Sequence, residues 1–128
     1  MRVLVDTHVL LWTLLSPRKL SRAARELVRD VENVLHVSTA SAWEIATKHR
    51  LGRLPEANAV VHHYLDHLRR LHADELVITS AHALMAGGFS QPHRDPFDRL
   101  LAAQCVIEGL PLVSNDEALQ KFPITVIW

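Results

Sequence analysis

The sequence predicts an α/β fold, in which a mostly parallel sheet of about five short strands is covered by helices on both faces. Short apolar runs alternate with longer segments of helical pattern along all 128 residues, as in successive βαβ units. The runs are apolar nearly throughout, as expected of strands that are buried on both faces. Hydrophobic residues make up 48% of the chain, which is enough for the core of one domain spanning residues 1–128.

Five short runs have the length and composition of strands. Each is rich in valine, leucine or isoleucine, and polar residues, proline or glycine stand close by. We expect strands at Arg2–Val5, Val34–Val37, Leu76–Ile78, Leu112–Val113 and Thr125–Ile127.

The segments between the runs carry the start and stop signals of helices. Pro17 ends a first helix that is apolar almost all round, and glycine ends three others. Pro96 suits the first position of a helix, with Asp95 before it as the cap. The third helix begins at either Ser38 or Ser41. We expect helices at Thr7–Leu15, Ser21–Asp30, Ser38 or Ser41 to Gly52, Pro55–Ala73, Ser80–Gly88, Asp95–Glu108 and Asp116–Lys121.

Composition narrows the class of protein. Val9–Ser16, the longest uncharged stretch near the start, is far shorter than the roughly 20 apolar residues of a membrane span. Asp6 interrupts any signal peptide after three apolar residues. Cys105 is the only cysteine, so no internal disulfide can form and we expect a cytoplasmic protein. Its apolar helical setting favours a core residue over a nucleophile.

The charges balance, with 14 basic and 14 acidic residues. This balance weakens any case for nonspecific binding to nucleic acid. Basic residues nevertheless gather in residues 18–29 and 48–53. The first cluster favours a solvated helix face, with a local phosphate-binding patch as the alternative.

Four acidic residues occupy positions that neutral residues normally fill: Asp6, Glu44, Asp98 and Asp116. Each follows an apolar run at a helix start or lies on the apolar part of a helix. A carboxylate near a core is costly unless something compensates it. In a parallel sheet, sites form beyond the carboxyl ends of the strands, where these residues could meet. A hard divalent cation would compensate such a cluster.

Helix capping is the alternative explanation for each acid. Asp6, Asp95 and Asp116 could cap the helices that follow them. Glu44 could complete a capping box if its helix begins at Ser41, or pair with Lys48 one turn away. A helix that begins at Ser38 would place Glu44 in the second turn, out of capping reach.

Residues around the acids form four motifs: Val5–Trp12, Ser41–Leu54, His93–Gln104 and Val113–Asp116. In order and spacing they resemble the successive motifs of PIN-domain ribonucleases, and most closely those of VapC-like toxins of type II toxin–antitoxin pairs. The second motif, with SAWEIATK, and the third, with RDPFDRLLAAQ, are the more specific. The resemblance spans essentially the whole chain.

The resemblance implies a three-layer α/β/α sandwich with a metal-dependent endoribonuclease site. Asp6, Glu44, Asp98 and Asp116 would be the acidic set around Mg²⁺ or Mn²⁺, with Asp95 as an accessory carboxylate. Ser114 matches a small hydroxyl residue that supports the site. Arg94 and Lys48 are candidates to steer the scissile phosphate. The implied partners are an RNA substrate, a cognate antitoxin and a second copy of the chain in a homodimer.

Three alternative hypotheses about function are also consistent with parts of the sequence. A phosphoacceptor signalling domain has a similar length and a carboxylate-bound Mg²⁺, but it needs an acidic pair after the first strand, and Asp6 stands alone. A non-catalytic regulatory partner would keep the acids for capping only. Nine histidines invite a zinc site, with His63 and His67 one turn apart beside His62, but no HExxH pattern or cysteine cluster supports it.

Overall fold

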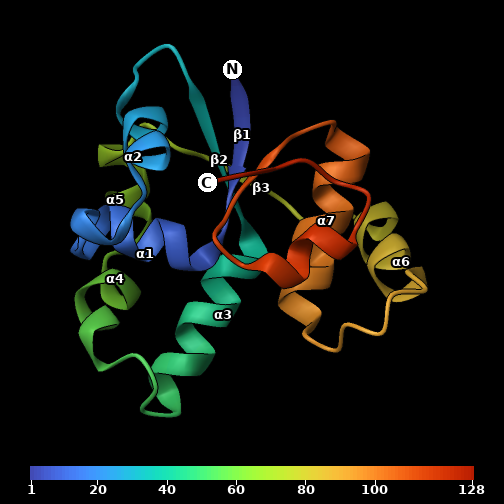
Figure 1. The fold of residues 1–128 in the computed structure, drawn as a ribbon. Coiled ribbons are helices and arrows are strands. Elements are labelled where there is room, and N and C mark those ends of the chain that lie inside the picture. Colours follow the sequence, from blue (N-terminus) through green and yellow to red (C-terminus); the bar gives the residue numbers. More distant parts are fainter.

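The computed structural model describes residues 1–128, and its centre is a five-stranded sheet (Figure 1). The strand order is β3-β2-β1-β4-β5, and every neighbouring pair is parallel. The first strand of the chain therefore lies in the middle of the sheet, as the predicted α/β class allows. The strands are β1 (Arg2–Val5), β2 (Val34–Ser38), β3 (Asp74–Leu76), β4 (Leu112–Val113) and β5 (Val126–Ile127).

Seven helices surround the sheet and complete the predicted three-layer arrangement. In Figure 1, α1, α2, α4 and α5 lie on one side of the sheet, whereas α6 and α7 lie on the other. Short 3₁₀ turns occupy Pro17–Lys19, Pro55–Ala57 and Glu117–Lys121. The helices are α1 (Thr7–Leu15), α2 (Arg22–Arg29), α3 (Thr39–Arg50), α4 (Asn58–His62), α5 (Tyr64–Arg70), α6 (Ser80–Gly88) and α7 (Pro96–Glu108).

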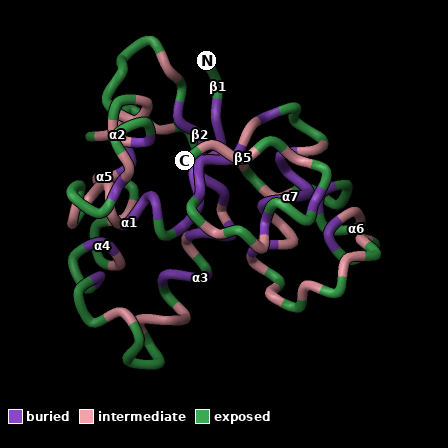
Figure 2. Tube along the Cα trace, in the orientation of Figure 1, coloured by how far each residue is buried: buried purple, intermediate pink, exposed green.

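The core consists of two layers, one on each face of the sheet. Val3 and Val5 of β1 face the larger layer, with α1, α2, α4 and α5. Leu4 points the other way, into a smaller layer with Leu101 of α7 and Leu112 of β4. Alternate side chains of a strand point to opposite faces, so β1 holds both layers together. Figure 2 shows the resulting concentration of buried positions along the central strands.

The third strand lies two residues earlier than the sequence predicts. It spans Asp74–Leu76 instead of Leu76–Ile78, because Asp74 pairs with His36 and Leu76 with Ser38 of β2. This strand is at the edge of the sheet, where a strand needs no continuous apolar run. Its first two residues, Asp74 and Glu75, are accordingly exposed.

Two predicted helices also differ from those in the structure. The helix expected over Pro55–Ala73 is broken into a 3₁₀ turn, α4 and α5, because His63 has a non-helical backbone (φ −129°, ψ 37°). The third helix begins after Ser38, whose Oγ accepts the N–H of Ala40 at 3.0 Å. The alternative start at Ser41 is therefore wrong, and Glu44 lies beyond the first turn.

None of the helices combines the length and the apolar character that a membrane crossing would require.

Candidate active site

Asp6 stands at the carboxyl end of the central strand, where it is 3% exposed. Its backbone N–H donates to the carbonyl of Val113 in β4 at 3.0 Å. Its side chain makes no capping hydrogen bond to α1. Instead, Ser114 Oγ donates a 2.6 Å hydrogen bond to Asp6 Oδ2. Capping does not explain this carboxylate.

Glu44 lies on α3 and is 3% exposed. Lys48 Nζ contacts its Oε2 at 2.5 Å, whereas its Oε1 is buried without a hydrogen-bond partner. The helix is held beside α1 by a buried 2.9 Å hydrogen bond between Thr7 Oγ1 and Ser41 Oγ. A buried carboxylate oxygen without a partner is costly, so this position needs a further ligand or proton.

Asp98 lies in the first turn of α7 and is also buried. Its Oδ2 is 2.8 Å from Nε2 of His93, in the loop before the helix. Asp95 is the cap of α7, since its Oδ1 accepts the backbone N–H groups of Phe97 at 2.9 Å and Asp98 at 3.3 Å. The two acids of this motif thus have different structural positions, and only Asp98 is free of the capping role.

Asp116 is half-buried and caps the 3₁₀ turn at Glu117–Lys121, because its Oδ1 accepts the N–H of Ala118 at 2.9 Å. Its own backbone N–H donates to Ser114 Oγ at 3.0 Å. Ser114 thereby joins the main chain at Asp116 to the side chain of Asp6. In this structure the Asp116 carboxylate therefore acts as a helix cap, as the capping alternative predicts.

The buried carboxylates influence one another electrostatically. Burial raises the pKa of Asp6, and the charge of Glu44 raises it further, although Ser114 and His8 act in the opposite direction. Burial likewise raises the pKa of Asp98 to about 7, with added repulsion from Asp95 and Asp6 that the His93 contact partly offsets. Asp6 therefore senses the charges of α3 and α7 together, which carboxylates scattered over the fold would not do.

The donor set suits a hard divalent cation, which carboxylate oxygens bind best. The orphaned oxygen of Glu44 and the raised pKa values of Asp6 and Asp98 indicate missing positive charge. The side chains are not arranged around one point, however: no three His, Cys, Asp or Glu groups are placed to hold a metal ion together. Lys48, His93 and the cap at Ala118 each engage one carboxylate instead.

Arg94 is exposed, and Lys48 reaches Glu44 with part of its side chain still open to solvent. Sequence reasoning did not foresee the role of Arg99. Its guanidinium donates to the carbonyls of Ala86, Phe89, Gln91 and His93 at 2.7 to 2.9 Å. A cation in the first turn of a helix opposes the helix dipole, and that unfavourable placement was the available signal that Arg99 had other partners.

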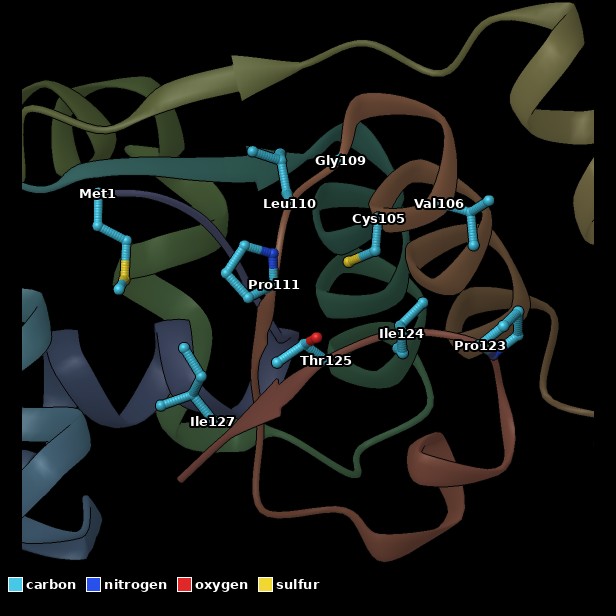
Figure 3. Close-up of a pocket in the computed structure, with 10 residues that line it drawn as sticks. All are labelled: Met1, Cys105, Val106, Gly109, Leu110, Pro111, Pro123, Ile124, Thr125 and Ile127. Carbon is cyan, nitrogen blue, oxygen red and sulfur yellow. The ribbon is translucent and has the colours of Figure 1, made fainter.

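The largest pocket lies elsewhere, at the amino edge of the sheet. It has a volume of about 500 Å³ and is lined by side chains such as Met1, Leu110, Pro111 and Thr125 (Figure 3). Cys105, its one titratable side chain, has a pKa raised to about 12 by burial and by the charge of Asp6. A thiol whose pKa is raised in this way is a poor nucleophile.

The structure also bears on two of the rival readings. A phosphoacceptor domain of the flavodoxin-like type has the strand order 2-1-3-4-5, whereas this sheet has the order 3-2-1-4-5. The histidines at positions 62, 63 and 67 are not gathered around a common point. His62 Nδ1 contacts the carbonyl of Asn58 at 2.7 Å.

A parallel sheet with β1 at its centre, and buried acids after β1 and on α3 and α7, defines a class of α/β protein with an acidic site at the carboxyl edge. The chain belongs to the PIN domain family, whose pattern matches residues 3–124.

Two relatives from Mycobacterium tuberculosis are similar in sequence. The chain is 31% identical to Ribonuclease VapC22 over 131 aligned positions, which cover 97% of each protein. It is 41% identical to Ribonuclease VapC16 over 58 residues, covering 45% of this chain and 41% of that relative.

One solved structure has a similar fold. It is the crystal structure of VapBC2 from Rickettsia felis bound to a DNA fragment from their promoter. The TM-score is 0.65 at 11% sequence identity, and the match covers 99% of this chain and 98% of the other. At that identity the likeness extends to the fold alone.

Proposed function

We propose that this protein is a metal-dependent endoribonuclease, which hydrolyses RNA phosphodiester bonds with water activated by Mg²⁺ or Mn²⁺. The observation that carries the proposal is the set of buried, mutually repelling carboxylates of Asp6, Glu44 and Asp98 at the carboxyl edge of the sheet. Burial of such a set destabilises the fold unless a cation compensates it. The names of the two sequence relatives support RNA as the substrate.

Four carboxylates would hold the cation together. We assign Asp6 and Asp98 to direct contact, because both are buried with raised pKa values. Glu44 would contribute its unpartnered oxygen, and Asp116 would complete the shell or hold a bound water. A bound divalent cation lowers the pKa of a water ligand and neutralises charge on the phosphate.

Other residues would orient the acids and the substrate. Ser114 fixes one oxygen of Asp6, and Asp95 fixes the first turn of α7 below Asp98. Lys48 and Arg94 carry positive charge beside the site and would bind the phosphate. Arg99 would keep the loop that carries His93 in place.

We further propose that the protein is the toxin of a type II toxin–antitoxin pair, acting in the cytoplasm as one nuclease domain over residues 1–128. The VapC names of the relatives and the VapBC title of the structural neighbour support an antitoxin partner. The homodimer implied by the resemblance is a further prediction, which sedimentation of the purified chain tests.

Cleavage of an end-labelled single-stranded RNA tests the function. We expect cleavage in Mg²⁺ or Mn²⁺, none in EDTA, and a loss of about 10³-fold in Asp98→Asn, because one direct contact to the cation is removed. Glu117→Gln is the matched control: it neutralises an exposed acid next to Asp116 and should retain full activity. Cleavage that survives EDTA or Asp98→Asn would contradict the proposal.

A further inference from the structure

Trp43 is a large aromatic side chain that the fold does not use for its core. It is 56% exposed and belongs to neither core layer. Tryptophan is normally well buried, and Trp12 shows the usual behaviour by packing against the larger layer. Trp43 therefore contributes little to stability in its present position, although it occupies the position next to Glu44.

A second aromatic ring holds Trp43 in place. Phe97 packs against it with ring centroids 4.7 Å apart and an interplanar angle of 76°, an edge-to-face contact. Phe97 comes from the first turn of α7, directly before Asp98. Successive residues on a helix point about 100° apart. Both α3 and α7 thus carry an aromatic residue directly before a buried carboxylate in the chain, and the contact between the two rings joins the two helices at these positions.

The charges around this aromatic pair suit a polyanion. On the exposed side of α3, Trp43 is followed by Ala46 and then by Arg50, at spacings of three and seven residues that share one helix face. Lys48 contacts Glu44 at 2.5 Å, and Arg94 is an exposed cation directly before Asp95 in the chain. The large apolar side chains most exposed elsewhere, such as Val31 and Leu84, belong to other parts of the chain. Exposed aromatic rings near positive charge are a combination found on surfaces that bind single-stranded nucleic acid.

We propose that Trp43, held by Phe97, stacks on a nucleobase next to the scissile phosphate and so requires a single-stranded RNA substrate. This inference rests on the proposed ribonuclease function. Aromatic rings recognise unstacked bases of single strands, which a duplex hides. Stacking tolerates any base, so Trp43 selects the unpaired state of the RNA and positions the backbone, whereas it does not read a particular sequence.

The first test compares two substitutions of Trp43. In Trp43→Leu we expect kcat/KM for a short single-stranded RNA to fall about 10- to 100-fold, mainly through a higher KM. Trp43→Phe should recover most of the loss because it keeps a stacking ring. Leu51→Ala is the control, since Leu51 ends the same helix with 50% exposure and is not at the site. Equal kcat/KM in Trp43→Leu and the wild type would overturn the proposal.

The second test removes the base in place of the ring. Once the cleavage position has been mapped, an RNA with an abasic nucleotide beside it should be cleaved by the wild type as slowly as Trp43→Leu cleaves the intact RNA. Trp43→Leu should be indifferent to the missing base, because coupled changes are not additive. Additive losses would overturn the proposal, as would a change in the oligomeric state of Trp43→Leu, which would place this face between two copies of the chain.

Fluorescence makes the proposal testable even if the leucine variant folds poorly. With Trp12→Phe and Trp128→Phe, Trp43 is the only tryptophan. Single-stranded RNA should quench its emission in EDTA, and a duplex of the same sequence should not. If an RNA that the same protein cleaves in Mg²⁺ does not quench Trp43, the stacking proposal is refuted but the ribonuclease function is not. A wild-type protein that cleaves no RNA would refute the proposed function.

Discussion

The two edges of the sheet are built from the same strands, but they bury opposite kinds of residue. At the carboxyl edge the buried residues include Asp6, Ser38 and Ser114. At the amino edge Leu110 is buried, and Pro111 lines an apolar pocket. At the carboxyl edge strands lead into helix starts, where free N–H groups and the helix dipole favour acidic and hydroxyl groups. At the amino edge helix ends lead into strands and can be closed by apolar contacts.

The difference indicates that packing at the amino edge supports stability, whereas the carboxyl edge is where we propose that the chemistry takes place. Each fully buried leucine or valine contributes about 1.5–3 kcal/mol, whereas a buried carboxylate costs free energy unless it is paired. Mutations at the amino edge should therefore lower stability through lost packing, and the carboxyl edge should gain stability whenever its charges are neutralised. Three measurements test this difference between the two edges.

The largest effect on stability is expected at the amino edge. Leu110→Ala should lower the free energy of unfolding by about 3 kcal/mol, because it leaves a cavity in the smaller core layer. Urea unfolding would measure the loss, and RNA cleavage per folded molecule should stay unchanged. Ile107→Ala, at a more exposed position of the same helix end, should cost less than about 1 kcal/mol. A selective loss of cleavage in Leu110→Ala would show that the amino edge also affects the reaction, which would contradict this comparison.

A smaller effect on stability is expected at the carboxyl edge, where neutralising a charge should stabilise the fold. Burial raises the pKa of Asp98 in the folded protein to about 7 from an ordinary value of 3.8, so the folded state binds the proton more tightly than the unfolded state. The resulting stability is fully present below pH 4 and is lost as the pH rises through 7.

Metal-free protein should accordingly be about 2 kcal/mol more stable at pH 5 than at pH 8, after allowance for residual solvation of this carboxyl group. Urea unfolding in EDTA at the two pH values measures the difference. Asp98→Asn should reduce it to the part that Asp6 contributes, whereas Glu117→Gln should retain it in full. An equal difference in Asp98→Asn and the wild type would show that Asp98 is not the group responsible.

The smallest effect is expected from the cation. At ten times its dissociation constant, Mg²⁺ or Mn²⁺ should stabilise the wild type by about 1.4 kcal/mol, which corresponds to a Tm increase of roughly 4–6 °C. Asp6→Asn should lose most of this shift because one ligand is missing. Differential scanning fluorimetry with and without cation measures both proteins. An equal Tm increase in Asp6→Asn would show that Asp6 is not a ligand of the cation.

Much of the fold could be predicted from local signals. The caps at Ser38 and Asp95 and the glycine at 109, with a left-handed φ of 66°, mark helix ends within a few residues. The edge strand and the break at His63 could not be predicted in the same way. The first depends on pairing with β2, and the second on the buried contacts of Val60 and Leu68 on either side of the break.

The candidate site was only partly readable from sequence. The motifs drew attention to Asp6, Glu44 and Asp98, but Asp95 and Asp116 carry the same type of side chain and act here as caps. Glu44 and Lys48 form an ion pair four residues apart, and so do Arg22 and Glu26. The first pair is buried at its acidic end and the second is fully solvated, and no local pattern distinguishes them.

Local sequence was enough for the helix starts and ends that a cap or a glycine marks, such as Asp95 and Gly109, because a cap and its partner lie within one turn of the chain. Tertiary structure alone decided which acids are buried together. Ser114 reaches Asp6 across 108 positions of the chain, and this contact exists because β4 pairs with β1. Burial and mutual repulsion depend on that strand order, which forms through long-range packing of the two core layers.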